Sequence, residues 1–529
     1  MSSAEARSRG QKAWRWVAIV ALLAVIVLSF VGELMVHRAA PILKGRVLET
    51  LRTRFDSRVE LDGFDVSVLK GLAIEGSGLR IYPPEDVMAA GASRPLIAIR
   101  HFTFHTNLAG LFLKPMHVGT VDVDGLVIDV PPKTEREAGA KPERRRKGKI
   151  TIVVDAIVCT GSRLLIESSK PDKDPKDFAL ERIEMHNVGP NQPWRYQATL
   201  TNAVPRGEIH ANGLFGPWHT EDPGASSVLG HYTFDDADLG TIKGIGGTLS
   251  SVGNFKGQLN KIAVQGTTKT PDFSIDTGDH PVPLETTFDA VVDGTTGDTY
   301  LSRVDATLGQ SQFTTSGAVV NLKGQGHRID LDVEVPGGRI QDFLTLAVKT
   351  RPAIMTGQIA MKAKLVIRPG KQRVAEKLGM QGGFSLTAIH FTNPEWEDKV
   401  DMMSLRAEGR PKEAKPGATD VHSEMTGQFA MDRGELRFKS LKYTLPGADV
   451  ALVGVYSMDG NKFDFTGTVR TKARLSQMVA SRWKSLLLKP VDPFFDKNGA
   501  GAEIPVKISG TKGAPKFGLD MHHKGAAGS

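Results

Sequence analysis

From Val59 onward, apolar residues fall at every second position, and this period restricts the fold more than any other feature of the sequence. Ile329, Leu331 and Val333 alternate with acidic residues, and the run from Ile359 to Leu365 alternates with glutamine, alanine and lysine. Successive side chains of a β-strand point to opposite sides, so each run predicts a strand with one apolar and one polar face. The sequence therefore predicts a mainly β chain.

Glycines interrupt this alternation at many points. The chain contains 56 glycines without a collagen-like period. Within the segment 121–130 the apolar phase shifts at Gly125, which predicts a β-bulge or a tight bend. The heptapeptide that starts at Met355 recurs at Met425 with a single difference. Repetition of this kind predicts a sheet that grows in one direction, strand by strand.

An apolar segment near the N-terminus predicts a membrane span. Residues 16–36 contain Glu33 as their single charged residue, and four basic residues lie in the segment 1–15. Roughly 20 residues are enough to cross a ~30 Å hydrocarbon core. Basic residues before a span favour a cytoplasmic N-terminus, so we expect a cytoplasmic tail, an anchor, and the remaining chain beyond the membrane. The alternative is a cleaved signal peptide, but these have shorter apolar cores and a small-residue cleavage site.

Few segments have a helical period. Residues 37–56 predict an amphipathic linker helix between the membrane and the first strand. Shorter patterns at 339–348, 373–378 and 474–488 predict helices that cap or plug the sheet.

The tract 133–149 is polar, charged and without a period, so it predicts a disordered, solvated loop. Deletion of Thr134 to Lys147 is therefore expected to leave the fold intact. Binding of its basic cluster to a membrane surface or a partner is the alternative.

The net charge of +8 is concentrated in two short segments. Residues 1–15 contribute +3 and residues 133–149 contribute +5, so the rest of the chain is neutral. A uniformly basic surface is therefore unsupported, and we expect no nucleic-acid partner. Cys159 is the single cysteine, which excludes an intrachain disulfide and a thiolate zinc cluster.

No motif for catalysis or metal binding stands out. His101 and His105 would lie ~13 Å apart on one face of a strand, too far to chelate an ion. The histidine pair in the C-terminal tail fits exposed surface residues better than ligands. Acidic pairs such as Glu395 and Glu397 are typical of the wet face of a strand or loop. We therefore predict no enzyme activity, no catalytic residue, no metal site and no cofactor.

Three stretches together resemble the AsmA-like family of bacterial envelope proteins. The first, after the anchor and linker, is SRVELDGFDVSVLKGLAIEGSGLRIYPP at residues 57–84. The second runs from GGRIQDFLTLAVK at residue 337 to GGFSLTAIHFTNP, which ends at residue 394. The third is LKPVDPFFDKNGAGAEIPVKISGTKGAPKFGLD at residues 488–520. The resemblance covers about half of the chain and is strongest after residue 337.

The resemblance implies an elongated, antiparallel β-sheet that curls into a taco-like groove with an apolar interior, related in architecture to bridge-like lipid-transfer proteins. It also implies phospholipid transfer between the inner and outer membranes, or a role in outer-membrane homeostasis. We therefore expect a single-pass inner-membrane protein whose bulk lies in the periplasm. Its ligands would be phospholipid acyl chains, and another envelope protein is a candidate partner to complete the path.

The resemblance also divides the chain. Residues 57–216 would form an N-terminal AsmA-like β region that includes the basic loop, and residues 217–336 the middle groove repeats. Residues 337–521 would form the C-terminal AsmA-like region with capping helices, and residues 522–529 a tail.

The alternation selects candidates for the groove lining. They are Val121, Val123, Leu126, Ile128, Ile329, Leu331, Val333, Ile359, Met361 and Leu365. Only the resemblance assigns this face to a groove, because the same residues also fit the packed core of a sandwich. The alternative function is thus a non-enzymatic envelope scaffold or assembly factor with a closed core that binds a protein partner along a sheet edge.

Overall fold

The computed structural model describes most of the chain after residue 56. It covers residues 57–519 apart from 68–71, 84, 90, 92, 107–115, 132–151, 168–175, 190–191, 218, 220–221, 279, 458–461, 497–500 and 512–513. Seven residues between 41 and 52 are also described, and they are helical. The predicted span at 16–36 lies outside these residues, and no helix within them is long and apolar enough to cross a membrane.

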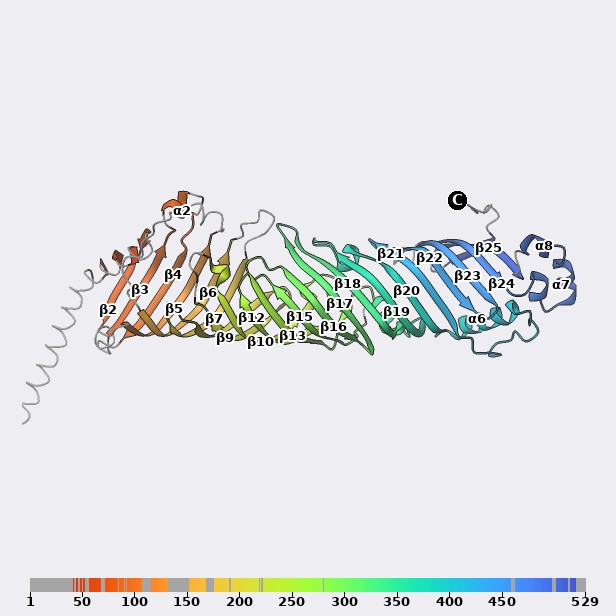
Figure 1. Cartoon of the computed structure of the whole chain (residues 1–529), viewed down its shortest axis with the longest axis horizontal. Coiled ribbons are helices and arrows are strands. Elements are labelled where there is room, and N and C mark those ends of the chain that lie inside the picture. The colour runs from red at the N-terminus through yellow and green to blue at the C-terminus, as the bar shows by residue number, and fades with distance from the viewer. Residues whose placement is uncertain are drawn as a thin grey trace, which may run out of the picture.

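The described residues form a long, narrow body in which the chain advances from one end to the other (Figure 1). Its framework is one sheet of 24 strands. The strands of its first half are β1 (Val59–Glu60), β2 (Gly63–Ser67), β3 (Leu72–Ile81), β4 (Ile97–Thr106), β5 (Met116–Val130), β6 (Ile152–Ile166), β7 (Lys176–Val188), β8 (Trp194–Ala203), β9 (Arg206–Phe215), β10 (Ser227–Asp238), β12 (Thr248–Gln258) and β13 (Lys261–Thr270).

The second half continues the same sheet. Its strands are β15 (Leu284–Val292), β16 (Thr299–Leu308), β17 (Ser311–Leu322), β18 (Gly326–Arg339), β19 (Met355–Ile367), β20 (Leu378–Phe391), β21 (Ser423–Asp432), β22 (Glu435–Leu445), β23 (Ala448–Ser457), β24 (Phe463–Thr471), β25 (Ala502–Thr511) and β26 (Ala514–Leu519). A separate two-stranded sheet joins β11 (Ile245–Gly246) to β14 (Ser274–Ile275). The prediction of a mainly β chain is confirmed.

From β3 onward, neighbours in the main sheet follow one another in the chain, as the repeat predicted; β1 and β2 both pair with β3. The two copies of the heptapeptide lie in β19 and β21, on either side of β20. The described pairings are antiparallel with one exception: β5 and β6 run parallel, with Met116 opposite Ile152 and Val130 opposite Ile166. The expectation of a wholly antiparallel sheet is therefore wrong at this one step.

Parallel neighbours need a connection that returns along the strand. β5 is 15 residues long, which corresponds to ~46 Å at 3.3 Å per residue step. The chain between Val130 and Ile152 must cover that distance, and the basic tract 133–149 belongs to this connection, outside the described residues. The topology thus gives the length of the tract a structural role that composition did not suggest.

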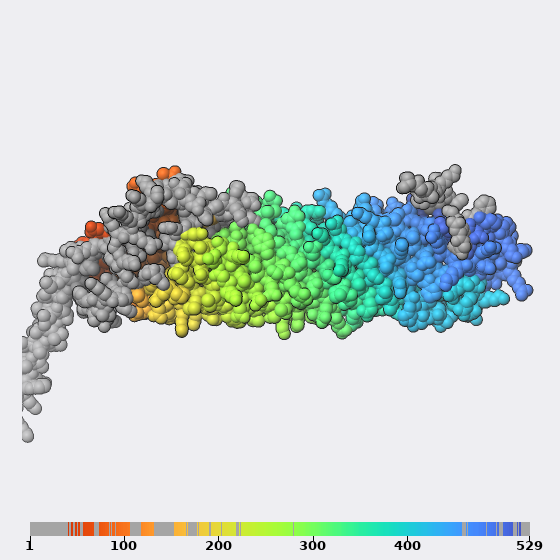
Figure 2. All heavy atoms as spheres, viewed as in Figure 1, coloured from red at the N-terminus to blue at the C-terminus, as the bar shows by residue number. Residues whose placement is uncertain are grey.

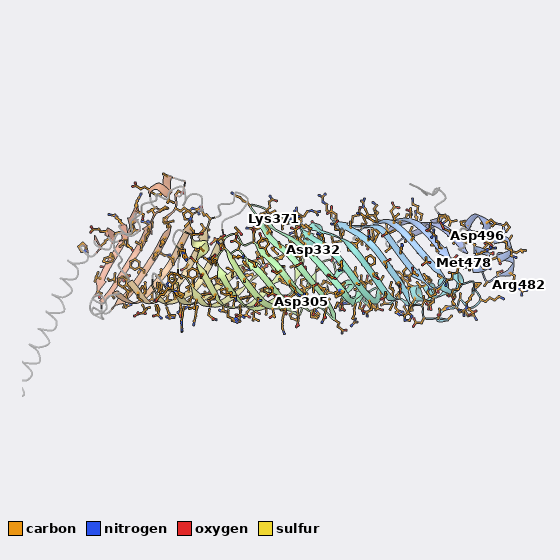
Figure 3. The ribbon with its side chains drawn as sticks, in the orientation of Figure 1. Asp305, Asp332, Lys371, Met478, Arg482 and Asp496 are labelled. Atoms are coloured by element: carbon orange, nitrogen blue, oxygen red, sulfur yellow. The ribbon has the colours of Figure 1, made fainter. Side chains whose placement is uncertain are left out.

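Helices are short and sit at the margins of the sheet. They are α2 (Glu85–Ala89), α4 (Ile340–Ala347), α5 (Val374–Lys377), α6 (Pro394–Ala407), α7 (Arg482–Leu488) and α8 (Asp492–Phe495), with 3-10 turns η2 (Pro223–Ala225), η3 (Leu239–Thr241) and η4 (Leu475–Met478). The helices predicted at 339–348 and 373–378 are confirmed. The helix predicted at 474–488 is divided into η4 and α7. Both lie at the far end of the body, where Figure 3 labels Met478 of η4, Arg482 of α7 and Asp496, which follows α8.

Helix α6 was not predicted. Asn393 caps it, because its side-chain oxygen accepts hydrogen bonds from the backbone N–H groups of Glu395 and Trp396, and proline occupies the first turn. Glu395 and Glu397 are therefore acids in the first turn of a helix, where the helix dipole favours them, rather than residues of a strand or loop.

A bulge or a tight bend was predicted at Gly125; β5 pairs with β4 and β6 there without a register shift, so no bulge is present. Gly125 has a φ of +67°, and Gly161, at the same level on β6, has a φ of +55°. Gly78 on β3 also has a positive φ, of +65°, and lies at the same level of the sheet as these two glycines. Beyond these left-handed residues, the half-buried Leu126 and Ile128 lie opposite Ile99 and Ile97, so an apolar cluster of side chains continues across the two strands.

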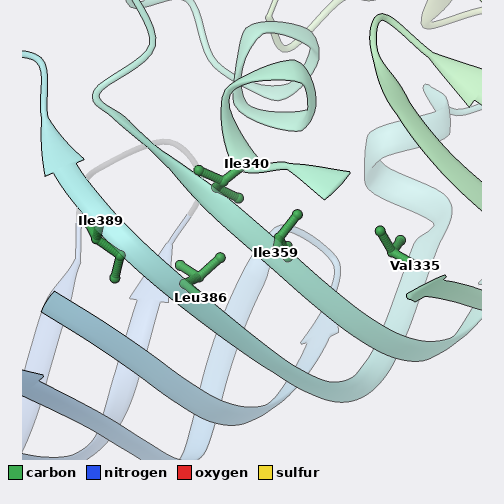
Figure 4. Close-up of a cluster of buried hydrophobic side chains, with 5 residues drawn as sticks. All are labelled: Val335, Ile340, Ile359, Leu386 and Ile389. Atoms are coloured by element: carbon green, nitrogen blue, oxygen red, sulfur yellow. The ribbon is translucent and has the colours of Figure 1, made fainter. Parts of the chain in front are cut away.

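The largest buried cluster lies where α4 packs on β19. Val335, Ile340, Ile359, Leu386 and Ile389 form it, and Ile389 and Val335 are each 1% exposed. Figure 4 shows Ile340, at the start of the helix, above the side chains that β19 and β20 contribute. This part of the apolar face is a closed hydrophobic core.

Candidate functional site

The register of the sheet places one apolar residue of every strand from β2 to β26 in a single line. We call this line the first row. It consists of Val66, Ile74, Phe104, Val121, Ile157, Met185, Tyr196, Gly213, Gly230, Phe255, Val264, Ala290, Leu301, Gly317, Leu331, Leu365, Met380, Met431, Leu436, Tyr456, Phe463, Gly510 and Pro515. Every member is aliphatic, aromatic, proline or glycine, and none carries a charge.

A second row lies beside it on the same face, two residues away on each strand that has no bulge between the rows. It consists of Phe64, Gly76, Phe102, Val123, Cys159, Ile183, Ala198, Ala211, Tyr232, Gly253, Gly266, Phe288, Val304, Thr315, Val333, Ala363, Gly382, Phe429, Phe438, Gly454, Phe465, Ile508 and Phe517. Thr315 is the one member of the second row with an aliphatic hydroxyl group. The two rows together form what we call the apolar stripe, which at ~4.8 Å per strand is roughly 100 Å long.

The opposite face has a different chemistry. Between the two rows, on the other side of the sheet, the line that passes through Asp122 continues through Glu184, Gln197, Asn212, His231, Asn254, Gln265 and Asp289, with Val158 between the first two. Neighbouring residues of a strand point to opposite sides, so this polar line lies behind the apolar stripe. Apart from Val158, the chain therefore keeps polar side chains on one face and apolar side chains on the other along these strands.

Large side chains of the first row are half-buried from Phe104 to Tyr456, so the stripe keeps apolar surface accessible. The two tyrosines of the central strands lie in apolar surroundings. Burial raises the pKa of Tyr196 to about 12. Burial also raises the pKa of Tyr232, although the hydroxyl of Ser251, 3.0 Å from the Tyr232 hydroxyl, opposes the shift.

Aromatic rings of the stripe, and of Phe384 beside it, lie close to cross-strand glycines. A Cβ atom added to Gly427 would stand 2.7 Å from the ring of Phe384, and one added to Gly253 would stand 2.7 Å from the ring of Tyr232. A Cβ atom at Gly454 would meet the ring of Phe465 at the same distance. Because these glycines have no Cβ atom, the rings can approach the backbone of the sheet closely.

Eight of the ten predicted lining residues lie on this face by alternation, and Leu126 and Ile128 lie beyond the left-handed Gly125. Val121, Leu331 and Leu365 belong to the first row, and Val123 and Val333 to the second. The other five occupy flanking positions, namely Leu126, Ile128, Ile329, Ile359 and Met361.

Burial separates these residues into two groups. Ile359 is 6% exposed and belongs to the cluster under α4, and Val333 and Met361 pack against that cluster. Val123 is 7% exposed, whereas Ile329 and Leu331 are half-buried. The central residues of the stripe, from Tyr196 to Phe288, were missed, because their membership depends on register rather than on any local motif.

A hollow of about 750 Å³ crosses the middle of the body from β16 to β22. Most of its side chains belong to the polar face, including Asp332 (Figure 3), Glu334, Lys362 and Lys364. Lys362 pairs with Glu334 at 2.7 Å and Lys364 with Asp332 at 3.7 Å across neighbouring strands. Arg303 and Lys439 also line the hollow, so its lining has four basic and two acidic side chains and is weakly basic.

Comparison with known proteins gives no match of any kind: no family model, no curated protein and no solved structure matches this chain. The resemblance to the AsmA-like family therefore stays a prediction.

Proposed function

We propose that this chain is an inner-membrane-anchored periplasmic protein that binds lipid acyl chains along the apolar stripe and contributes to phospholipid transfer between the two membranes. The observation that supports it is the first row, which runs from β2 to β26 without a charged or amide side chain. On this proposal the sheet curls around its apolar face and forms the groove that the AsmA-like resemblance implies.

An acyl chain fits the stripe for two reasons. Contact with a methylene chain removes apolar area from water, which stabilises a complex by ~25 cal/mol per Å². Transfer along the stripe also requires that no position resist an apolar ligand, because an unpaired buried charge is costly to desolvate. The first row meets this requirement on every strand, whereas a local lipid pocket would need only a few apolar residues.

The half-buried state of the row favours a ligand site over a closed core. Core side chains of a sandwich would be as buried as Val335, at 1% exposure. Leu331, four residues earlier on the same strand and face, is only half-buried. On the face seen in Figure 2, side chains of the central and C-terminal strands form an unbroken surface.

A photo-crosslinking amino acid tests the proposal in the full chain within its membrane. It would replace Leu331 or Met380 on the stripe, and as matched controls Asp332 or Gln381, the adjacent residues on the polar face. We expect phospholipid adducts, identified by mass spectrometry, from the two stripe positions and none from the controls. Equal labelling of both faces, or adducts with protein alone at the stripe, would contradict lipid binding and favour a scaffold.

The membrane orientation needs its own test. The basic residues before the predicted span place the N-terminus in the cytoplasm and the β body in the periplasm. A phosphatase that is active only in the periplasm, fused after Gly525, should therefore be active in intact cells. Activity confined to a fusion with a cytoplasmic reporter would overturn the orientation.

A further inference from the structure

Two histidines face each other where β20 meets β21. Ile389 lies opposite Ser423 in the register, so His390 and His422 occupy the next cross-strand position, at the end of the ladder. Their ring centroids are 5.1 Å apart, and their planes are nearly perpendicular. Because opposite residues of antiparallel strands are close neighbours, the backbone itself brings the two imidazoles together.

Carboxylates complete the cluster. Asp420 lies two residues before His422, and its Oδ1 is 3.4 Å from Nδ1 of His390. Glu397, from the first turn of α6, places Oε1 3.0 Å from the same nitrogen, and its other oxygen accepts a hydrogen bond of 2.7 Å from the backbone N–H of Phe391. The ligand atoms of His390, Asp420 and His422 all lie within 4.8 Å of one another.

Hydrogen bonds to α6 hold this arrangement in place. The Asp398 carboxylate accepts a hydrogen bond from the backbone N–H of Gly417, and the Asp401 carboxylate accepts one from the N–H of Val421. These bonds fix the segment that carries Asp420 and His422 against the helix that carries Glu397. The cluster therefore joins a strand, a helix and a loop that are distant in the sequence.

The cluster has an excess of negative charge. Two carboxylates approach one imidazole nitrogen, which has at most one proton to donate. Among the ion pairs of the described residues, Glu397 and Asp420 pair with His390 and with no lysine or arginine. The pKa of Asp401 is raised, first by burial and further by the charges of Glu397, Asp420 and Asp398. A bound cation would relieve this repulsion.

We propose that His390, Asp420 and His422 bind one divalent transition-metal ion, for which Zn²⁺ is the best fit. The ion would take Nε2 of His390, while the proton on Nδ1 is donated to Glu397, which orients the ring. Two imidazole nitrogens with a carboxylate oxygen form a donor set that suits Zn²⁺ and not Mg²⁺ or Ca²⁺. Zinc holds such atoms at about 2.0–2.2 Å, so the ligand atoms must rotate inward from their present separation, which the exposed side chains of Asp420 and His422 allow. A carboxylate that orients a ligating histidine is a usual second partner in such sites.

The ion would join the segment before β21, which carries Asp420 and His422, to His390 of β20. Glu397 would connect α6 to the same site, beside the closed core under α4. This role is independent of lipid binding, since the ligands lie at the end of the strands and not on the apolar stripe. It revises the prediction of no metal site. No local motif reveals it, because 31 residues separate His390 from His422 and only the register brings them together.

Metal binding can be measured on the full chain in detergent micelles, purified without a histidine tag and stripped with a chelator. Titration with Co²⁺, followed by visible absorption, reports coordination geometry, and competition with Zn²⁺ gives the affinity. His522→Gln/His523→Gln serves as the background, because that adjacent pair could bind metal by itself. We expect one Co²⁺ per chain with the intense visible bands of a tetrahedral site.

Substitutions identify the ligands. His390→Gln and His422→Gln should each weaken Zn²⁺ binding by more than the ~10–100-fold expected for Glu397→Gln, an outer partner. His231→Gln is the matched control, because His231 also faces a cross-strand residue, Asn254, but without a carboxylate. Circular dichroism shows whether each variant is folded.

Two results would overturn the site. One is the absence of a tetrahedral Co²⁺ spectrum from the His522→Gln/His523→Gln background protein. This result does not depend on the ligand variants. The other is an affinity for Zn²⁺ that His390→Gln and His422→Gln change no more than His231→Gln does.

Discussion

Two regions of the apolar face have the same sequence pattern and different packing. On β18, Val335 lies in the cluster under α4 and is 1% exposed, while Leu331 lies in the first row and is half-buried. Farther toward the N-terminus, from β7 to β13, no α-helix of the described residues makes extensive contact with the strands, and Tyr196, Phe255 and Val264 are all half-buried. Alternation therefore selects the face, and α4 makes one part of that face a core, although Cys159 and Ile74 of the stripe are also buried far from this helix.

This difference separates structural from functional apolar residues. Where α4 packs on β19, apolar side chains stabilise the fold by excluding water. Where no helix covers them, the same residue types leave apolar surface for a ligand. Predictions that use matched residues from the two regions can test whether the separation is real.

The largest effect is expected from shortening the connection between β5 and β6. Deletion of Thr134 to Lys147 leaves seven residues between Val130 and Ile152, and these span at most ~29 Å, less than the ~46 Å return that the parallel pairing needs. The register therefore reverses the expectation that this deletion is harmless. We expect loss of β5–β6 pairing, seen as exposure of Cys159 to thiol reagents and as a change in circular dichroism.

A replacement of the same 14 residues by a glycine–serine sequence of equal length is the control for that deletion. It should restore the fold, because the connection between β5 and β6 needs a sufficient length and not a particular composition. A deletion variant as stable as the parent would show that the parallel pairing is incorrect.

The next largest effect compares a charge in the two regions of one strand. Val335→Asp should lose ~4 kcal/mol or more, because it leaves an unpaired charge in the closed core. Leu331→Asp, alone or with Ile329→Asp, should lose only ~1–2 kcal/mol but reduce the bound phospholipid. Urea unfolding and lipid mass spectrometry measure the two outcomes. If both variants unfold equally, the stripe is a core throughout.

A smaller effect is expected where a ring lies over a glycine. Gly427→Ala should lose ~1–3 kcal/mol, because its Cβ atom would meet the Phe384 ring and force it off the sheet. Gly383→Ala is the matched control, since the nearest atom to its Cβ is the Gly427 carbonyl oxygen at 3.6 Å. Thermal unfolding compares them. A cost as large for Gly383→Ala would indicate a general backbone effect.

The smallest effect concerns the single cysteine. Burial raises the pKa of the Cys159 thiol to about 11, and the side chain is 1% exposed. A raised pKa lowers the thiolate fraction at pH 8, and burial blocks access, so a chromogenic disulfide reagent should not react with the native chain. Full reaction is expected in denaturant. Rapid reaction of the native protein would mean that β6 opens locally, in contrast to the C-terminal core.

The sequence by itself determined the strands and the division of their faces. The period of two around Ile329 and Leu331 is a local property, and so is the change of phase at Gly125, because both depend on side-chain direction within a single strand. The short helices at 339–348 and 373–378 were equally local. Helix α6 could have been found from Asn393, Pro394 and the acids that follow, which are ordinary signals of a helix start.

Only the tertiary structure decided what these local elements form together. The first row exists because the register aligns one apolar residue from each strand, and the period of a strand does not fix its register against a neighbour. The parallel step between β5 and β6 gave the basic tract its role, although its composition indicated none. The pairing of His390 with His422 likewise depends on two strands that meet in space, which no pattern within either strand could show.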